Sequence, residues 1–196
     1  MPTSYLLLDM PFDASAEAVI AKLLKAMDAI DPSGEGFVED GHQETPTQTM
    51  TRFLNEDEDM AITLCEDKTA RLRYLEVQAE SDAALKQALA CLRKHLATVE
   101  HGAIVNAITK AKNDETLPEN IFYQLAYSAP GWPEAATEAL LLHALASADP
   151  KTREGAATAV GVLGWEHLKT PLLKALARER DEQVREAMER AKRIFV

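Results

Sequence analysis

Three places in the sequence bring together residue types that could do chemistry. Glu100-His101 and Glu166-His167 each place a carboxylate beside an imidazole, which can bind a metal ion, and Cys91 lies one helical turn before His95, the spacing of a nucleophile and its base. Both have simpler interpretations, because the Glu-His pairs fall where helices are predicted to begin and Cys91 lies at the margin of a leucine stripe. The sequence contains no glycine-rich phosphate loop, serine elbow or paired-carboxylate motif. We therefore predict that the protein is not an enzyme and holds no metal or cofactor.

Acidic residues gather in the first part of the chain. The net charge is −11, and residues 1–80 contain 6 Lys and Arg against 17 Asp and Glu, whereas residues 81–196 contain 15 of each. An acidic surface repels nucleic acid and anionic membranes and speeds association with a basic partner, although acidity can also serve solubility alone. The candidate partner-binding residues are the acids of one polar loop and of the run that follows: Glu35, Glu39, Asp40, Glu44, Glu56, Asp57, Glu58 and Asp59.

The run Glu56-Asp57-Glu58-Asp59 is the sharpest local charge feature. An exposed hairpin turn explains four polar residues but does not require that all four are acids. Calcium is a weaker explanation, since the run lacks the glycine and the terminal glutamate of an EF-hand loop. The run therefore favours a patch that docks lysine and arginine side chains of a protein partner.

Composition places the chain among folded proteins, with 46% hydrophobic and 27% charged residues. Asp9 interrupts the apolar run Tyr5–Leu8 and no basic residue precedes it, so the start lacks the layout of a secretory signal. No apolar run approaches the roughly 20 residues that span a bilayer. Cys65 and Cys91 belong to no Cys-x-x-Cys pair and suit free thiols in a reducing compartment, so we expect a cytoplasmic protein.

Residues 1–80 are predicted to form an acidic α+β domain. A strand over 4–10 precedes a helix over about 14–30, capped by Asp13 or Ser15, and the stretch 35–46 reads as loop with at most a short strand at Phe37-Val38. Apolar alternation then predicts three strands, Thr47–Leu54, Met60–Cys65 and Ala70–Ala79, joined by short hairpin connections. The expected order is β-α-β-β-β-α, with an antiparallel sheet and with the next helix packed on it.

Residues 81–196 change to helical periodicity and keep it to the end. Helices are expected over about 82–97, 100–112, 119–128, 134–147, 150–163, 167–179 and 182–194, separated by Gly, Pro and Asp positions. Strands followed by helices alone indicate an α+β fold with an all-α second domain.

Two signatures recur in the second domain at about 32 residues, the period of a two-helix repeat. Asp149-Pro150-x-x-Arg153 returns as Asp181-x-x-Val184-Arg185, and Leu141-Leu142-x-Ala144-Leu145 returns as Leu172-Leu173-x-Ala175-Leu176. The aspartates suit helix N-caps, small residues such as Ala156 allow close helix approach, and Gly164 permits the turn between helices. From about residue 99 the chain resembles the HEAT-like repeats of bilin-lyase-like proteins, in units of about 84–112, 117–147 and 149–179 with a terminal helix. The resemblance implies that Arg153 and Arg185 pair with adjacent units and are structural.

A repeat of this kind stacks on its neighbours and presents an extended binding surface. The leading hypothesis is a non-catalytic protein-binding module, most concretely an immunity protein that neutralises a basic toxin. One alternative is a lyase or chaperone for a cofactor-bearing protein, with a pocket lined by Trp132, Trp165, His143 and His167, as the resemblance suggests. Another is a nucleic-acid-binding solenoid, disfavoured because acids interleave with the C-terminal cations, as on a solvated helix face: Glu179, Asp181, Glu182, Glu186 and Glu189. No membrane partner is expected, and the sequence leaves the oligomeric state open.

Overall fold

The computed structural model describes residues 1–30, 36–111, 118, 120–130 and 132–195. They form two compact units, Met1–Val99 and Glu100–Val196, and each is described by itself. The division lies after Val99 rather than after Glu80, where we predicted it. The reason is that the helix beginning at Asp82 places its apolar face in the core of the first unit.

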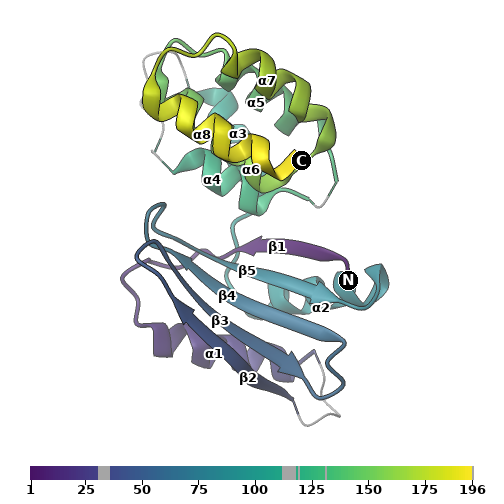
Figure 1. The fold of residues 1–196 in the computed structure, drawn as a ribbon. Helices are drawn as coiled ribbons and strands as arrows, with labels where there is room; N and C mark the ends of the chain where they lie inside the picture. Colours follow the sequence, from purple (N-terminus) through teal and green to yellow (C-terminus); the bar gives the residue numbers. More distant parts are fainter. Residues whose placement is uncertain (31–35, 112–117, 119, 131, 196) are drawn as a thin grey trace. The chain divides into compact units, whose positions relative to one another are not determined.

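A five-stranded antiparallel sheet forms the first unit (Figure 1). Its strands are β1 (Thr3–Leu7), β2 (Phe37–Glu44), β3 (Gln48–Asn55), β4 (Met60–Asp67) and β5 (Leu72–Ala79), in the spatial order β1-β5-β4-β3-β2. Strands β2 to β5 are a meander, and β1 pairs with β5 so that Leu6 lies opposite Leu75. The antiparallel sheet is as predicted.

Strand β2 is the element that the sequence prediction treated as loop. Only Phe37 of its eight residues is buried, so β2 carries no apolar alternation that sequence reasoning could use. Its hydrogen bonding to β3 holds it in the sheet, with an irregularity between Glu39 and Gly41. The order is therefore β-α-β-β-β-β-α, with one strand more than predicted.

Two helices cover one face of this sheet, α1 (Ala16–Asp28) and α2 (Asp82–His95). The hydroxyls of Ser15 and Ser81 accept the backbone N–H groups of Ala18 and Ala84, so each serine caps its helix. The core between helices and sheet is mainly aliphatic, with Leu23, Met27, Ile62, Leu75 and Leu92 almost completely buried.

Arg73 connects the sheet to the loop before α1. Its side chain is 4% exposed and lies 2.6 Å from Glu66, and it donates to the carbonyls of Pro11 and Ala14 at 2.9 and 2.7 Å. A buried guanidinium is tolerated here because a carboxylate and two carbonyls accept its N–H groups.

The second unit is built from helices in two layers (Figure 1). Helices α4 (Ile121–Ser128), α6 (Pro150–Leu163) and α8 (Glu182–Lys192) pack in sequence in one layer, and α3 (His101–Lys110), α5 (Ala135–Leu145) and α7 (Lys169–Leu176) form the other. Short 3-10 turns, Glu166–Leu168 and Arg193–Phe195, precede α7 and follow α8. The sequence predicted a first helical repeat over 84–112, but α2 belongs to the first compact unit and α3 to the second.

Local capping in the second unit is as the repeated signatures predicted. Asp149 accepts the N–H groups of Lys151 and Thr152, and Asp181 accepts those of Gln183 and Val184. Gly164 ends α6 in a left-handed conformation, with φ of 60°.

Small residues set the distance between α6 and its neighbours. Ala156, Ala157 and Ala159 are buried, and a Cβ placed on Gly161 would lie 3.1 Å from the Cα of Ala191 on α8. The backbones of α6 and α8 therefore approach closely at Gly161.

Candidate functional site

The predicted partner-binding acids lie in two elements. Glu39, Asp40 and Glu44 are on β2, and Glu56–Asp59 form the turn between β3 and β4. Glu35 lies outside the described residues. All of the described acids are exposed except Asp59, which is half-buried.

Asn55 fixes the conformation of the acidic turn. Its side-chain oxygen accepts the backbone N–H of Met60 at 2.9 Å, and its side-chain nitrogen donates to Asp59 at 2.7 Å. Glu58 adopts a φ of 55°, and its N–H donates to the carbonyl of Asn55. Asp59 therefore stabilises the turn, while Glu56, Asp57 and Glu58 project from it.

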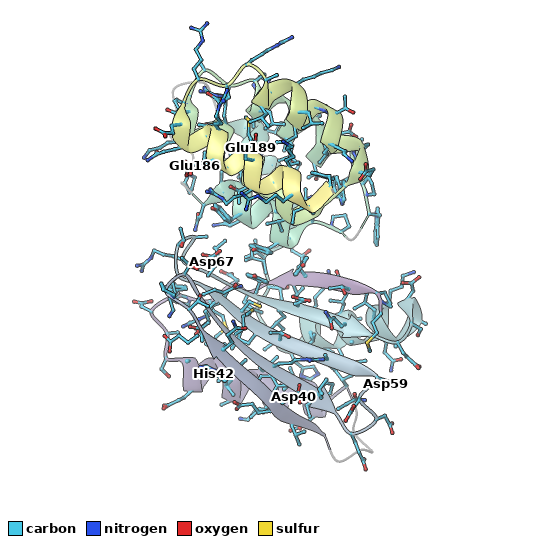
Figure 2. The ribbon with its side chains drawn as sticks, viewed as in Figure 1. Asp40, His42, Asp59, Asp67, Glu186 and Glu189 are labelled. Carbon is cyan, nitrogen blue, oxygen red and sulfur yellow. The ribbon has the colours of Figure 1, made fainter. Side chains whose placement is uncertain are left out.

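The structure divides the acids between the two ends of the sheet. The pairing of Phe37 with Asn55 brings the start of β2 beside the acidic turn, so Glu39 and Asp40 lie near it. Glu44 lies about 16 Å from Glu39 along the strand. It forms an ion pair with Lys68 at 2.7 Å. Figure 2 shows Asp40 and Asp59 toward one end of the sheet and Asp67 toward the other. The eight residues are therefore not one patch.

We call the five acids at the first end the acidic rim: Glu39, Asp40, Glu56, Asp57 and Glu58. Asp40 lies 3.5 Å from Arg52, whereas no ion pair joins the other four carboxylates to any described residue. Strand β2 pairs with β3 and with no other described strand, so it is an open edge of the sheet. Glu39 and Asp40 of the acidic rim lie on this edge.

The thiols show no sign of the nucleophile and base considered from the sequence. The recorded hydrogen bond of Cys91 is with the carbonyl of Ala26, at 4.0 Å, and not with His95. Cys65 is 1% exposed on β4, and burial raises the pKa of its thiol to about 12. Cys65 therefore lacks the environment of an activated cysteine.

His101 makes a cluster that local sequence did not predict. Its Nδ1 lies 2.9 Å from the hydroxyl of Ser128, and its Nε2 lies 2.9 Å from Glu134 and 2.7 Å from Thr137. The hydrogen bond from Thr137, followed by that from His101, lowers the pKa of Glu134. These partners are 27 to 36 residues away in the chain, so no spacing rule could have found them.

The His101 cluster has the composition of a serine, histidine and acid triad but not its surroundings. Ser128 is the last residue of α4, where the backbone groups without helical partners are carbonyls. An oxyanion needs N–H donors at this point, and carbonyls would repel it. The contacts of His101, at the start of α3, connect Ser128 at the end of α4 with Glu134 and Thr137 at the start of α5.

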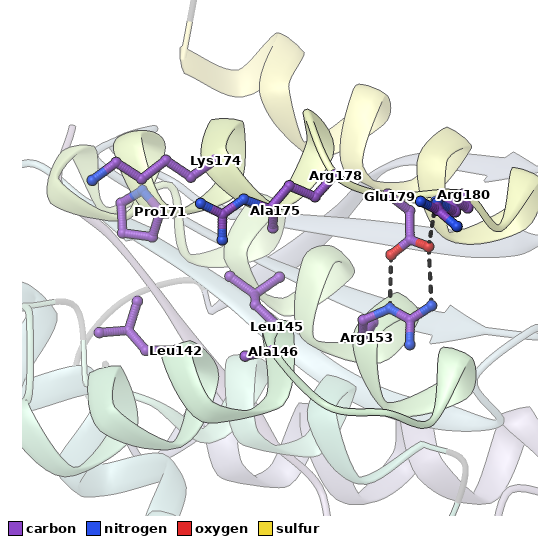
Figure 3. Close-up of a pocket in the computed structure, with 10 residues that line it drawn as sticks. All are labelled: Leu142, Leu145, Ala146, Arg153, Pro171, Lys174, Ala175, Arg178, Glu179 and Arg180. Atoms are coloured by element: carbon purple, nitrogen blue, oxygen red, sulfur yellow. Dashed lines mark hydrogen bonds and ion pairs between the residues drawn. The ribbon is translucent and has the colours of Figure 1, made fainter.

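A groove of about 530 Å³ lies on the second unit between α5 and α7. Figure 3 shows Leu142, Leu145 and Ala146 on one side and the side chains of α7 and the following turn on the other. The latter are Pro171, Lys174, Ala175, Arg178, Glu179 and Arg180.

At one end of the groove Arg153 and Glu179 form a bidentate ion pair. Nε and Nη2 of Arg153 lie 2.7 and 2.9 Å from the two carboxylate oxygens (Figure 3). Glu179 also accepts the N–H groups of Arg180 and Asp181, and its side chain is 5% exposed. The hydrogen bond from Arg153 is the main cause that lowers the pKa of Glu179 to about 2. Glu179 is therefore buried, not part of a solvated helix face as predicted.

The arginines of the repeated signature converge on this glutamate. Arg153 also donates to the carbonyls of Ser147 and Ala148, and Arg185 donates to the carbonyl of Glu179 at 3.3 Å. Arg153 thus links the turn before α6 to the turn before α8, and Arg185 adds a bond to the second of these turns.

The side chains proposed for a cofactor pocket do not line the groove. Trp165 is buried and stacks on His167, with ring centroids 5.9 Å apart, and His167 lies 3.3 Å from Glu138. Trp132 is 64% exposed, and His143 is exposed on α5.

Among the described residues, no group of three or more His, Cys, Asp or Glu side chains is arranged to hold a metal ion, and no helix is long and apolar enough to cross a membrane. Comparison of the chain with protein-family models, with curated proteins and with solved structures gave no match.

Proposed function

We propose that this protein is a non-catalytic protein-binding module that holds a basic partner through the acidic rim. The observation that carries the proposal is that Glu56, Asp57 and Glu58 are exposed on a turn fixed by Asn55, without an ion pair to any described residue. Such carboxylates keep their full charge for a partner, and a fixed turn loses little conformational entropy on binding.

The open edge of β2 adds a second means of recognition at the same place. Edge strands pair with extended segments of other proteins through their free backbone groups, and side-chain charges choose the segment. Glu39 and Asp40 on this edge favour a segment that carries lysine or arginine.

In its most concrete form the protein is an immunity protein and its partner is a basic toxin. The second unit then serves as a HEAT-like solenoid, an inference supported by its two helical layers and by the aspartate caps of α6 and α8. On this view the partner is a protein and neither nucleic acid nor membrane, in a cytoplasmic setting.

The test is affinity capture from the native host with three versions of the full chain. The rim variant combines Glu56→Gln, Asp57→Asn and Glu58→Gln, and the control removes three negative charges from α8 by Glu182→Gln, Glu186→Gln and Glu189→Gln. We expect the wild type and the control to capture a basic protein that the rim variant loses, and capture to weaken as salt screens the charges. A captured protein that is not basic, or capture that is indifferent to the rim substitutions, would contradict the proposal.

If the protein is an immunity protein, the captured protein must be a toxin. Expressed alone it should arrest growth, and co-expression of the wild-type chain, but not of the rim variant, should restore growth. A captured basic protein that is harmless would contradict the immunity function, whereas the proposal of a protein-binding module would stand.

A further inference from the structure

The groove of the second unit is positively charged although the protein as a whole is acidic. Lys174, Arg178 and Arg180 are exposed along it, and no ion pair joins them to any described residue. Glu179 is the one acid among the described residues that line the groove, and it is already paired with Arg153. The next acid along the chain, Asp181, accepts backbone N–H groups of α8.

The other wall of the groove is apolar. Leu142 remains 37% exposed, Leu145 beside it is buried, and Pro171 and Ala175 add apolar surface on the α7 side. A row of cations thus faces a row of aliphatic side chains (Figure 3).

The cations are spread along the groove rather than gathered at a point. Lys174 lies on α7 and Arg178 lies in the turn that follows it, and Figure 3 shows Arg180 beyond them at the end where Arg153 and Glu179 meet. A ligand that matches all three must carry several negative charges in a row and an apolar group beside them.

We propose that this groove binds an acidic segment of a partner protein, with carboxylates on Lys174, Arg178 and Arg180 and an aliphatic or aromatic side chain against Leu142 and Leu145. Single-stranded nucleic acid fits less well, because none of the described residues that line the groove is aromatic, so bases have nothing to stack on there. The site is independent of the acidic rim, since it lies in the other unit and selects the opposite charge.

The test is selection of displayed random twelve-residue peptides on the immobilised full chain. The selected peptides are then measured by fluorescence anisotropy against variants, together with a labelled twelve-nucleotide single-stranded DNA. We expect peptides in which Asp or Glu flank Leu, Ile or Phe. The double variant Lys174→Gln with Arg178→Gln should bind them about tenfold more weakly, the loss expected for two exposed charge pairs, and Leu142→Ser should weaken binding as well.

The matched control is Arg190→Gln with Lys192→Gln, which removes two positive charges from α8 outside the groove. It should bind within about twofold of the wild type, and tryptophan fluorescence checks that every variant is folded. The proposal is overturned if selection gives no peptide that depends on the groove, if the selected peptides are not acidic, or if the DNA binds as tightly as the peptides.

Discussion

Replacing Glu179 by Gln tests whether the ion pair with Arg153 stabilises the second unit. Glutamine has almost the same shape and can still accept the N–H groups of Arg180 and Asp181 through its oxygen. The substitution therefore removes the charge and one acceptor for Arg153 while leaving the packing of the turn in place. Arg153 keeps the remaining oxygen at Nη2 and the carbonyls of Ser147 and Ala148, but its Nε loses its acceptor.

Two independent arguments give the expected loss in the free energy of unfolding. Lowering the pKa of Glu179 from 4.5 to about 2 corresponds to about 3 kcal/mol in favour of the folded state. Breaking a buried ion pair by removing one partner typically costs about 3–5 kcal/mol. Since Arg153 is 17% exposed and water relieves part of its charge, we expect a loss of about 3 kcal/mol at pH 7.

The same ion pair predicts a pH dependence. The folded-state pKa of Glu179 is depressed, so its contribution is fully present above its ordinary pKa of 4.5 and is lost as the pH falls toward about 2. The difference in stability between the wild type and Glu179→Gln should therefore shrink across this window.

Urea unfolding followed by tryptophan fluorescence measures this loss in the right unit, because Trp132 and Trp165 are the two tryptophans of the chain and both lie in the second unit. With a slope of about 1.5 kcal/mol per molar urea, the midpoint should fall by about 2 M. Glu186→Gln is the control, since its ion pair with Arg190 spans 3.9 Å and its side chain is 68% exposed. It should change stability by less than about 0.5 kcal/mol. Equal midpoints for the Glu179 and Glu186 variants at pH 7 would refute the reasoning.

Four further outcomes are expected. Gly161→Leu should destabilise the second unit by about 1–3 kcal/mol in the same urea assay, because its side chain would push α8 away. Gly102→Ala, whose Cβ meets no atom within 4 Å, should stabilise the unit by up to about 1 kcal/mol. With a thiol reagent at pH 8, Cys91 should be the thiol of the folded chain that reacts readily, and Cys65 should react only on unfolding, since burial raises its pKa to about 12. Arg73→Met should lower the stability of the first unit by about 2–4 kcal/mol, seen as faster hydrogen exchange of the β5 amides, because Glu66 loses its counterion.

Sequence reasoning performed best where the signal is local. The start of α6 followed from Asp149 and Pro150, and its end from Gly164, because capping involves residues within one turn of each other. Strand β4 followed from apolar alternation. Strand β2 was missed because an exposed edge strand has no buried face and therefore no periodic pattern.

The division of the compact units after Val99, and not after Glu80, has a different reason. The stripe of Leu85, Leu89 and Leu92 predicts an amphipathic helix whether it packs on a sheet or on other helices. Sequence analysis did anticipate that this helix packs on the sheet, yet it assigned the helix to the second domain. Only the shared core with Val19 and Leu75 shows that α2 belongs to the first unit.

The sequence by itself determined the order of most elements, their caps, and the concentration of negative charge in the first part of the chain, since these depend on neighbouring residues or on counting. Only the tertiary structure decided which charges are still available. It pairs Glu179 with Arg153 across 26 residues and Glu44 with Lys68 across 24, while Glu56, Asp57 and Glu58 are left exposed. Ion pairs over such separations form where packing brings two elements together, so the groove and the acidic rim are properties of the fold.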